Sequence, residues 1–282
     1  MNLERFVNQL DDQKCVYIKV GNFNALSNMQ KGTWWFQHPA YFQKSTDGLR
    51  NDKNDSIIKR RYLIGKIPHF NATVTYEEYD DCDSARILCF YKLLLDKKGD
   101  FQHIDRRMMS FGSKFVFVDV NSLKEKIAAY LLEKQGEYIY SNLAPFDMFY
   151  YPETYYGEIG GRGKEDIFSF QCEYRLRIDS IKFIKDIARI KEVKIEEKNL
   201  HDALVAQENE AALYRNTVGE DKKNHAMKVM DYHKQYEDAY ERLLTAKSIH
   251  EEITGLSDCT SEVYDLDKLL QPNCRLSLFD VK

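Results

Sequence analysis

The sequence predicts an α+β fold, in which an aromatic-rich sheet domain is followed by a helical extension. Of the 37 aromatic residues in the 282-residue chain, only six follow residue 200. Short β-branched and aromatic runs fill the first part, whereas apolar residues three and four positions apart fill the last part. Hydrophobic residues make up 43% of the chain and charged residues 30%, which is ordinary for a protein with a buried core.

The strands and one helix follow in order along the first part. Strands are predicted where β-branched and aromatic runs end at Gly, Pro or Asn, over residues 14–20, 33–37, 72–79, 85–94, 114–120, 137–141 and 167–178. A helix is predicted over 122–135, capped by Asn121 or Ser122 and ending near Gly136. The segments 44–56 and 144–166 are rich in turn residues, and long loops of this kind are often functional.

The last part predicts two antiparallel helices. Apolar residues at helical spacing cover 196–216 and 221–253, with Gly219 between the helices and Gly255 after the second. We therefore divide the chain into a sheet domain, 1–190, and a helical extension, 191–282, which is a possible partner-binding region.

Charge and cysteine content exclude several classes of protein. The net charge is −4, with −6 after residue 200 and +2 before it, so the chain is no polybasic nucleic-acid coat. No run of 18 apolar residues is present and no secretory signal is visible, so we expect a cytoplasmic protein without membrane contact. The six cysteines form no CxxC pair, which predicts reduced thiols and no metal site.

The strand predicted over 167–178 carries the most informative pattern. Its alternation places Ser169, Gln171, Glu173, Arg175 and Arg177 on one face. Gln171 and Glu173 then lie roughly 6.5–7 Å apart, so that a carboxylate and an amide flank one ligand. The alternative is a solvated sheet face, on which Glu173 only pairs with a neighbouring cation.

From this strand the chain resembles the ADP-ribosyltransferase superfamily, whose last catalytic element is a Glu on or entering a strand. It is similar in particular to an intracellular, toxin-like branch, through an ordered series of short motifs between residues 14 and 180. These are Tyr17-Ile18-Lys19, Gly32 to Pro39, Asn51 to Asp55, Leu88-Cys89-Phe90, Ser110 to Phe115, Tyr138-Ile139-Tyr140 and Glu173-Tyr174-Arg175. The resemblance implies a split β-sheet core, with NAD as substrate and no metal.

The resemblance also implies roles for individual residues. Glu173 would stabilise the positive charge that develops on the ribose as nicotinamide leaves, and Gln171 would orient the ribose or the nucleophile. Trp35, Phe36 or Tyr140 would hold the nicotinamide ring, and Lys19 or Arg175 the pyrophosphate. Tyr17 and Ser110 take the positions of other cofactor-binding residues. The chain departs from the superfamily in having no Arg or His on the first strand and no Ser-Thr-Ser motif.

The acceptor of ADP-ribose is left open between nucleic acid, such as RNA, and protein. A nucleic-acid acceptor is favoured by basic residues that could contact phosphate, namely Lys59, Arg60, Arg61, Arg106 and Arg107. The alternative is that these charge runs form a solvated surface. Intracellular enzymes of this branch resemble toxins of toxin–antitoxin or anti-phage systems. The resemblance implies that an antitoxin or chaperone binds the helical extension. The alternatives are a non-catalytic module that binds nucleotide or protein and, with less support, a hydrolase.

Overall fold

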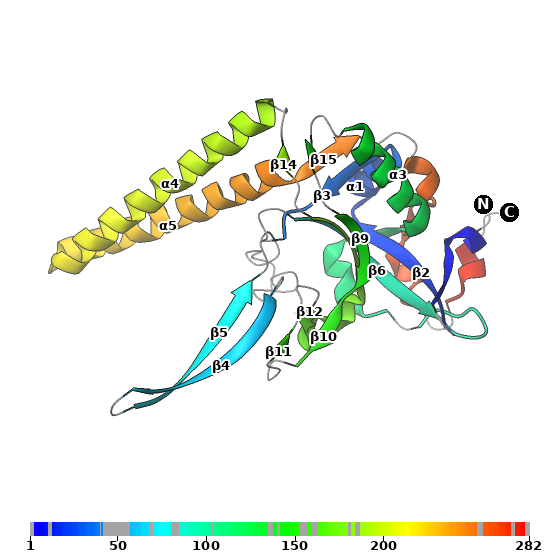
Figure 1. Cartoon of the computed structure of the whole chain (residues 1–282), viewed down its shortest axis with the longest axis horizontal. Helices are drawn as coiled ribbons and strands as arrows, with labels where there is room; N and C mark the ends of the chain where they lie inside the picture. The colour runs from blue at the N-terminus through cyan, green and yellow to red at the C-terminus, as the bar shows by residue number, and fades with distance from the viewer. Residues whose placement is uncertain are drawn as a thin grey trace.

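The computed structural model describes residues 3–10, 13–39, 41, 57–67, 70–79, 85–102, 104–134, 138–139, 142–152, 157–158, 163–179, 182–183, 187–252, 256–271 and 274–279. In this part of the chain the fold is mixed, with an antiparallel sheet and C-terminal helices, as expected (Figure 1).

The main sheet has the strand order β16-β7-β2-β6-β13-β9, and β1 pairs with β2 beside this path. Its strands are β1 (Val7–Leu10), β2 (Gln13–Gly21), β6 (Arg86–Leu95), β7 (Lys114–Val118), β9 (Asn142–Asp147), β13 (Glu173–Asp179) and β16 (Tyr264–Asp265). Every pairing in it is antiparallel. Strand β9 contains Pro145, which a sheet tolerates at its edge because proline has no N–H to donate.

Apolar side chains cover both faces of this sheet. On one face lie α1 (Phe23–Gln30) and α3 (Val120–Glu133), whose Leu26, Leu123 and Ile127 pack with buried residues of β2, β6 and β7. Asp119 caps α3 by accepting from the Ser122 N–H at 3.1 Å, so the helix begins two residues earlier than predicted, and the expected caps Asn121 and Ser122 lie within it.

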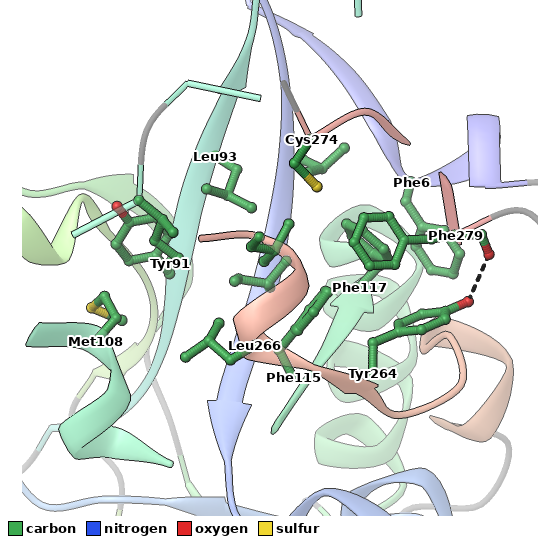
Figure 2. Close-up of a cluster of buried hydrophobic side chains, with 14 of the residues drawn as sticks. Phe6, Tyr91, Leu93, Met108, Phe115, Phe117, Tyr264, Leu266, Cys274 and Phe279 are labelled. Carbon is green, nitrogen blue, oxygen red and sulfur yellow. Dashed lines mark hydrogen bonds between the residues drawn. The ribbon is translucent and has the colours of Figure 1, made fainter. Parts of the chain in front are cut away.

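The other face is covered by short 3-10 helices, which are η1 (Leu3–Phe6), η3 (Arg106–Phe111), η4 (Asp166–Gln171), η6 (Leu266–Lys268) and η7 (Leu276–Phe279). Figure 2 shows this cluster, in which Phe115 and Phe117 of β7 meet Phe279 and Tyr264 near the C-terminus. The Tyr264 hydroxyl donates to the Phe279 carbonyl at 3.1 Å, which ties the last helix to the sheet (Figure 2).

The two predicted helices are α4 (Ile187–Asn216) and α5 (Glu220–Lys247), joined at Gly219. They form an antiparallel hairpin that projects away from the sheet (Figure 1). The second helix ends six residues earlier than predicted, because β15 (Ile249–Glu252) pairs with β3 (Thr33–Phe36) instead of continuing the helix.

The segment after this hairpin returns to the first part of the chain. After η5 (Leu256–Cys259), β16 pairs with β7, and Leu266, Leu269 and Phe279 are buried in the second cluster. The predicted helical extension, 191–282, is therefore not helical throughout. Its helices project away from the sheet, but residues 256–271 and 274–279 complete the core of the sheet domain.

Smaller sheets surround the main one. They pair β4 (Ile57–Ile67) with β5 (Phe70–Tyr79) and β11 (Gly157–Glu158), β10 (Phe149–Tyr151) with β12 (Gly163–Glu165), and β8 (Tyr138–Ile139) with β14 (Lys182–Phe183). Strand β4 was not predicted, because its basic residues hid the β-branched pattern. The loop expected over 144–166 likewise contains β10, β11 and β12.

The strand predicted over 167–178 is divided in the structure. Residues Asp166–Gln171 form η4, Cys172 adopts a left-handed conformation with φ 38° and ψ 50°, and β13 begins only at Glu173. The predicted alternation is therefore wrong before Glu173. Phe168 and Phe170 are both buried in the second cluster, although they lie on a 3-10 helix. A spacing of two between buried residues therefore did not distinguish a strand from a 3-10 helix here.

Candidate functional site

A pocket of about 240 Å³ lies where β2, β3, β6 and β13 meet η3, η4 and β12. Its wall is mainly apolar and aromatic, formed by Ile18, Val20, Trp35, Tyr41, Ile87, Leu88, Phe90, Tyr91, Met108 and Phe111. The polar groups at the pocket are Lys19, Gln37, Cys89, Lys164, Gln171 and Glu173. An apolar cavity with a few converging polar groups is the usual form of a small-molecule site.

Four of the predicted site residues come together here, namely Lys19, Trp35, Gln171 and Glu173. Three others lie elsewhere. Tyr17 is buried with its ring 4.3 Å from that of Tyr174, and Phe36 is part of the core under α1 and α3. Ser110 is exposed on η3, where its hydroxyl donates to the Arg107 carbonyl at 2.8 Å. Tyr140 lies outside the described residues.

Glu173 is buried between two cations. Its Oε1 accepts from Arg175 Nε at 2.5 Å, and its Oε2 lies 2.8 Å from Lys164 Nζ. The side chains of Glu173, Lys164 and Arg175 are only 7%, 3% and 2% exposed. Burial alone would raise the pKa of Glu173, but the charges of Arg175 and Lys164 outweigh it and hold the pKa below its usual range. Glu173 is therefore ionised at neutral pH.

Arg175, which was predicted to contact the cofactor, takes a supporting position instead. It lies fully buried beside Glu173 and does not line the pocket. The Glu173 backbone N–H also donates to the Tyr150 hydroxyl at 2.7 Å. Glu173 is thus held in place by contacts of its side chain and by a hydrogen bond of its backbone.

The turn at Cys172 brings Gln171 beside Glu173. Gln171 is the last residue of η4 and Glu173 the first of β13, with the left-handed Cys172 between them, and both side chains line the pocket. Lys164 Nζ donates to Gln171 Oε1 at 2.8 Å and also contacts Glu173, so one ammonium group joins the predicted pair. The alternation of a regular strand predicts the same pair of neighbours, but the structure places them side by side through this turn.

Lys164 is the site residue that the sequence analysis missed. It lies at the end of the segment 144–166, which was marked as functional only for its length and its aromatic residues. Its place on β12, which pairs in parallel with β10, carries it to β13. A single lysine in a glycine-rich stretch gives no signal of its own, so only the tertiary pairing could identify it.

Lys19 and Cys89 also line the pocket and contact each other. Lys19 Nζ donates to the Cys89 carbonyl at 2.7 Å and lies 5.8 Å from the centre of the Phe90 ring. Burial, and then the charge of Glu173, raise the pKa of the Cys89 thiol to about 12. Cys89 is therefore protonated and is no nucleophile in this state.

The two adjacent tryptophans differ in exposure, as expected for neighbouring residues of a strand. Trp34 is 1% exposed and packs near Phe90, whereas Trp35 is 43% exposed at the pocket. The Trp35 indole N–H donates to Gln37 Oε1 at 2.5 Å, which fixes the ring plane. Trp35 is thus available to stack on a flat ligand ring.

The predicted nucleic-acid residues form two separate groups. Arg106 and Arg107 are exposed on η3, where Arg107 pairs with Asp105 at 2.7 Å and lies over the Phe170 ring at 4.0 Å.

The second group, Lys59, Arg60 and Arg61, lies on β4. The register places Lys59 opposite Glu78 on β5 and Glu158 on β11, Arg60 opposite Glu77, and Arg61 opposite Tyr76.

Searches for related proteins give no match to a family model, a curated protein or a solved structure. The described residues contain no group of three or more His, Cys, Asp or Glu side chains that could hold a metal ion. Over the same residues, no helix is both long enough and apolar enough to span a bilayer.

Proposed function

We propose that this chain is a mono-ADP-ribosyltransferase, which binds NAD in the pocket around Glu173 and transfers ADP-ribose to a macromolecule. The observation that carries the proposal is the meeting of an ionised, buried Glu173 with Gln171, Lys19 and Trp35 at one cavity. Under this proposal the main sheet corresponds to the split sheet of that superfamily.

The chemistry of these groups fits the reaction. The bond from ribose C1′ to nicotinamide breaks, nicotinamide leaves with the electron pair, and a nucleophile of the acceptor bonds to C1′ and releases its proton to solvent. The sugar is positively charged in the transition state, and a fixed carboxylate stabilises that charge. A pKa below the usual range keeps Glu173 in the ionised form that this role requires.

The size of the pocket limits how NAD is held. About 240 Å³ is smaller than the roughly 300–1,000 Å³ of typical ligand sites, so the pocket takes the reacting half of NAD while the remainder lies outside. In this arrangement Trp35 stacks on a ring and Lys19 contacts phosphate.

The acceptor and the biological setting belong to the same proposal. We propose a nucleic acid such as RNA, or a protein, as acceptor, and a role as a cytoplasmic toxin of a toxin–antitoxin or phage-defence system. An antitoxin or chaperone would then bind the α4–α5 hairpin. Growth arrest on expression of the wild-type chain, but not of an inactive variant, tests this part.

The test of the activity combines purified protein, labelled NAD and cell extract, with the products divided by protease and by nuclease treatment. Label in a macromolecular fraction is expected with wild type and is lost in Glu173→Gln. Because that variant leaves two buried cations without their carboxylate, Trp35→Ala serves as a second variant, at an exposed pocket residue. Phe23→Ala is its control, since Phe23 is 57% exposed and does not line the pocket.

The alternative, a non-catalytic nucleotide-binding module, gives a different outcome. NAD or ADP-ribose then binds without release of nicotinamide, and binding weakens in Trp35→Ala without any labelled product. Absence of both binding and turnover contradicts the transferase proposal.

A further inference from the structure

The α4–α5 hairpin buries few apolar side chains of its own. Over the described part of the two helices, the fully buried apolar residues lie within 239–246, at the end of α5 that joins the sheet domain. Long helices in proteins depend on the burial of an apolar face for most of their stability. Many large apolar side chains of the hairpin are instead exposed, namely Ile195, Leu204, Val205, Leu213, Tyr214, Val218, Met227 and Met230.

One broad face of the hairpin is acidic. The cation among the residues that line its two grooves is Arg242, which pairs with Glu196 at 3.1 Å. Like charges on two copies of this face would repel each other, so it does not favour self-association. The carboxylates that line the same grooves are those of Glu192, Glu196, Asp202, Asp238 and Glu241.

The opposite face is apolar along its centre. Leu204, Ala211 and Val218 follow one another at intervals of seven residues, so they lie on one side of the first helix and the turn after it. Ala226 and Met230 of α5 lie on the same side of the antiparallel pair. The exposed fractions of Leu204, Met230 and Val218 are 38%, 73% and 85%. These five residues form the apolar hairpin face.

The hairpin is large enough to form a stable interface. An overlap of two hairpins over residues 197–216 is about 30 Å long, at a rise of about 1.5 Å per residue. Two helices side by side are roughly 20 Å wide, so such an overlap covers roughly 600 Å² on each copy. The total of roughly 1,200 Å² exceeds the roughly 1,000 Å² that a specific interface needs.

Charged residues beside the apolar hairpin face favour one orientation of a second copy. Arg215 and Lys223 lie toward the free end of the hairpin, whereas Glu197 and Glu237 lie toward the sheet domain. An antiparallel copy brings the basic residues of one hairpin over the acidic residues of the other, and a parallel copy brings like charges together. Glu208 lies near the midpoint, where it meets its own counterpart and opposes the pairing slightly.

We propose that two copies of this chain associate through the apolar hairpin face, with the hairpins antiparallel, and form a four-helix bundle. Leu204 of each copy then lies opposite Ala211 of the other, so that a large side chain faces a small one. The inference goes beyond the proposed transferase activity and does not depend on it.

The test is sedimentation equilibrium of the full chain, at protein concentrations from about 1 to 100 µM. A dimer is expected, with a Kd of roughly 10 µM or below for an interface of this size. Leu204→Glu and Met230→Glu are each expected to weaken it by roughly 10- to 100-fold, because each buries an unpaired carboxylate. Ile195→Glu is the matched control. Ile195 is 58% exposed and lies three residues from Glu192 and seven from Asp202, on the acidic face, so the dimer is unchanged.

A charge exchange tests the orientation. Lys223→Glu and Glu237→Lys are each expected to weaken the dimer, and the variant with both changes is expected to recover it. The two residues are fourteen positions apart on α5, or about 21 Å, so they cannot compensate each other within one chain. Circular dichroism confirms that each variant is folded, and if Leu204→Glu is not, the exposed Met230→Glu decides.

Three outcomes overturn the inference. They are a monomer throughout the concentration range, an equal loss in Ile195→Glu and Leu204→Glu, and no recovery in the charge exchange. A monomer would leave the apolar hairpin face to the antitoxin or chaperone proposed above. None of these measurements uses NAD, so the failure of the dimer and the failure of the transferase activity are distinguished.

Discussion

Replacing Glu173 by Gln changes the charge balance of a buried cluster in a way that can be calculated. Wild type holds Lys164, Glu173 and Arg175 with a net formal charge of +1. Glu173→Gln raises it to +2 without a carboxylate, whereas Lys164→Met lowers it to zero and leaves the pair of Glu173 with Arg175. The two substitutions therefore have very different expected costs, although each removes one charge.

The magnitudes follow from the behaviour of buried ion pairs. Loss of one partner that leaves an uncompensated charge costs about 3–5 kcal/mol, and a melting temperature falls about 2–4 °C for each kcal/mol in chains of this size. Glu173→Gln is thus expected to lower the melting temperature by roughly 6–20 °C. Lys164→Met is expected to cost less than about 1.5 kcal/mol, because a methionine of similar shape fills the site and the ion pair of Glu173 with Arg175 remains.

The assay is urea unfolding at pH 7 with thermal unfolding in parallel. The double variant Glu173→Gln/Lys164→Met is expected to be more stable than Glu173→Gln alone, since it removes one of the two buried cations that lose the Glu173 carboxylate. Glu241→Gln, at an exposed carboxylate of α5, is the control and is expected to change stability by less than about 0.5 kcal/mol. Equal losses in the two single variants, or no recovery in the double variant, would refute the charge-balance reasoning.

Three further predictions follow. The pKa of Glu173 is lower in the folded than in the unfolded chain, so its stabilising contribution is complete above about pH 5 and is lost as the pH falls toward the folded pKa. Urea unfolding between pH 7 and 3 should therefore show a smaller loss of stability in Glu173→Gln than in wild type. Parallel profiles of the two proteins would contradict this. Gly112→Ala should destabilise by more than about 3 kcal/mol, because its Cβ would lie 2.2 Å from the Gly21 backbone, whereas Gly99→Ala, also at positive φ but in open space, should cost only about 1 kcal/mol; equal costs in denaturant titrations would show that the clash is relieved. A chain ended at residue 248 should fail to fold, because it lacks Tyr264, Leu266 and Phe279, which pack with Phe115 and Phe117 in one buried cluster. A soluble product with a cooperative unfolding transition would contradict this.

The residues of the site show how much of it local sequence patterns could predict. Glu173 and Gln171 were selected together from their spacing, and both reach the pocket. The reason is different from the one inferred, since Cys172 turns the chain where regular alternation was expected. The adjacent Trp34 and Trp35 had to face opposite ways on a strand, and they do. Lys164, in contrast, has no local pattern that distinguishes it from any other surface lysine.

By itself, the sequence determined the existence of seven of the sixteen strands in the described residues and of the two long helices, because hydrophobic period and glycine position act within ten or twenty residues. Only the tertiary structure decided which distant segments meet. The pairing of β15 with β3 and of β16 with β7, and the approach of Lys164 and Arg175 to Glu173, depend on hydrogen bonds and charges between segments far apart in sequence. The sequence does not distinguish a charged residue that such contacts bury from one that is exposed to solvent. The residues that make up this site could therefore be identified only from the tertiary structure.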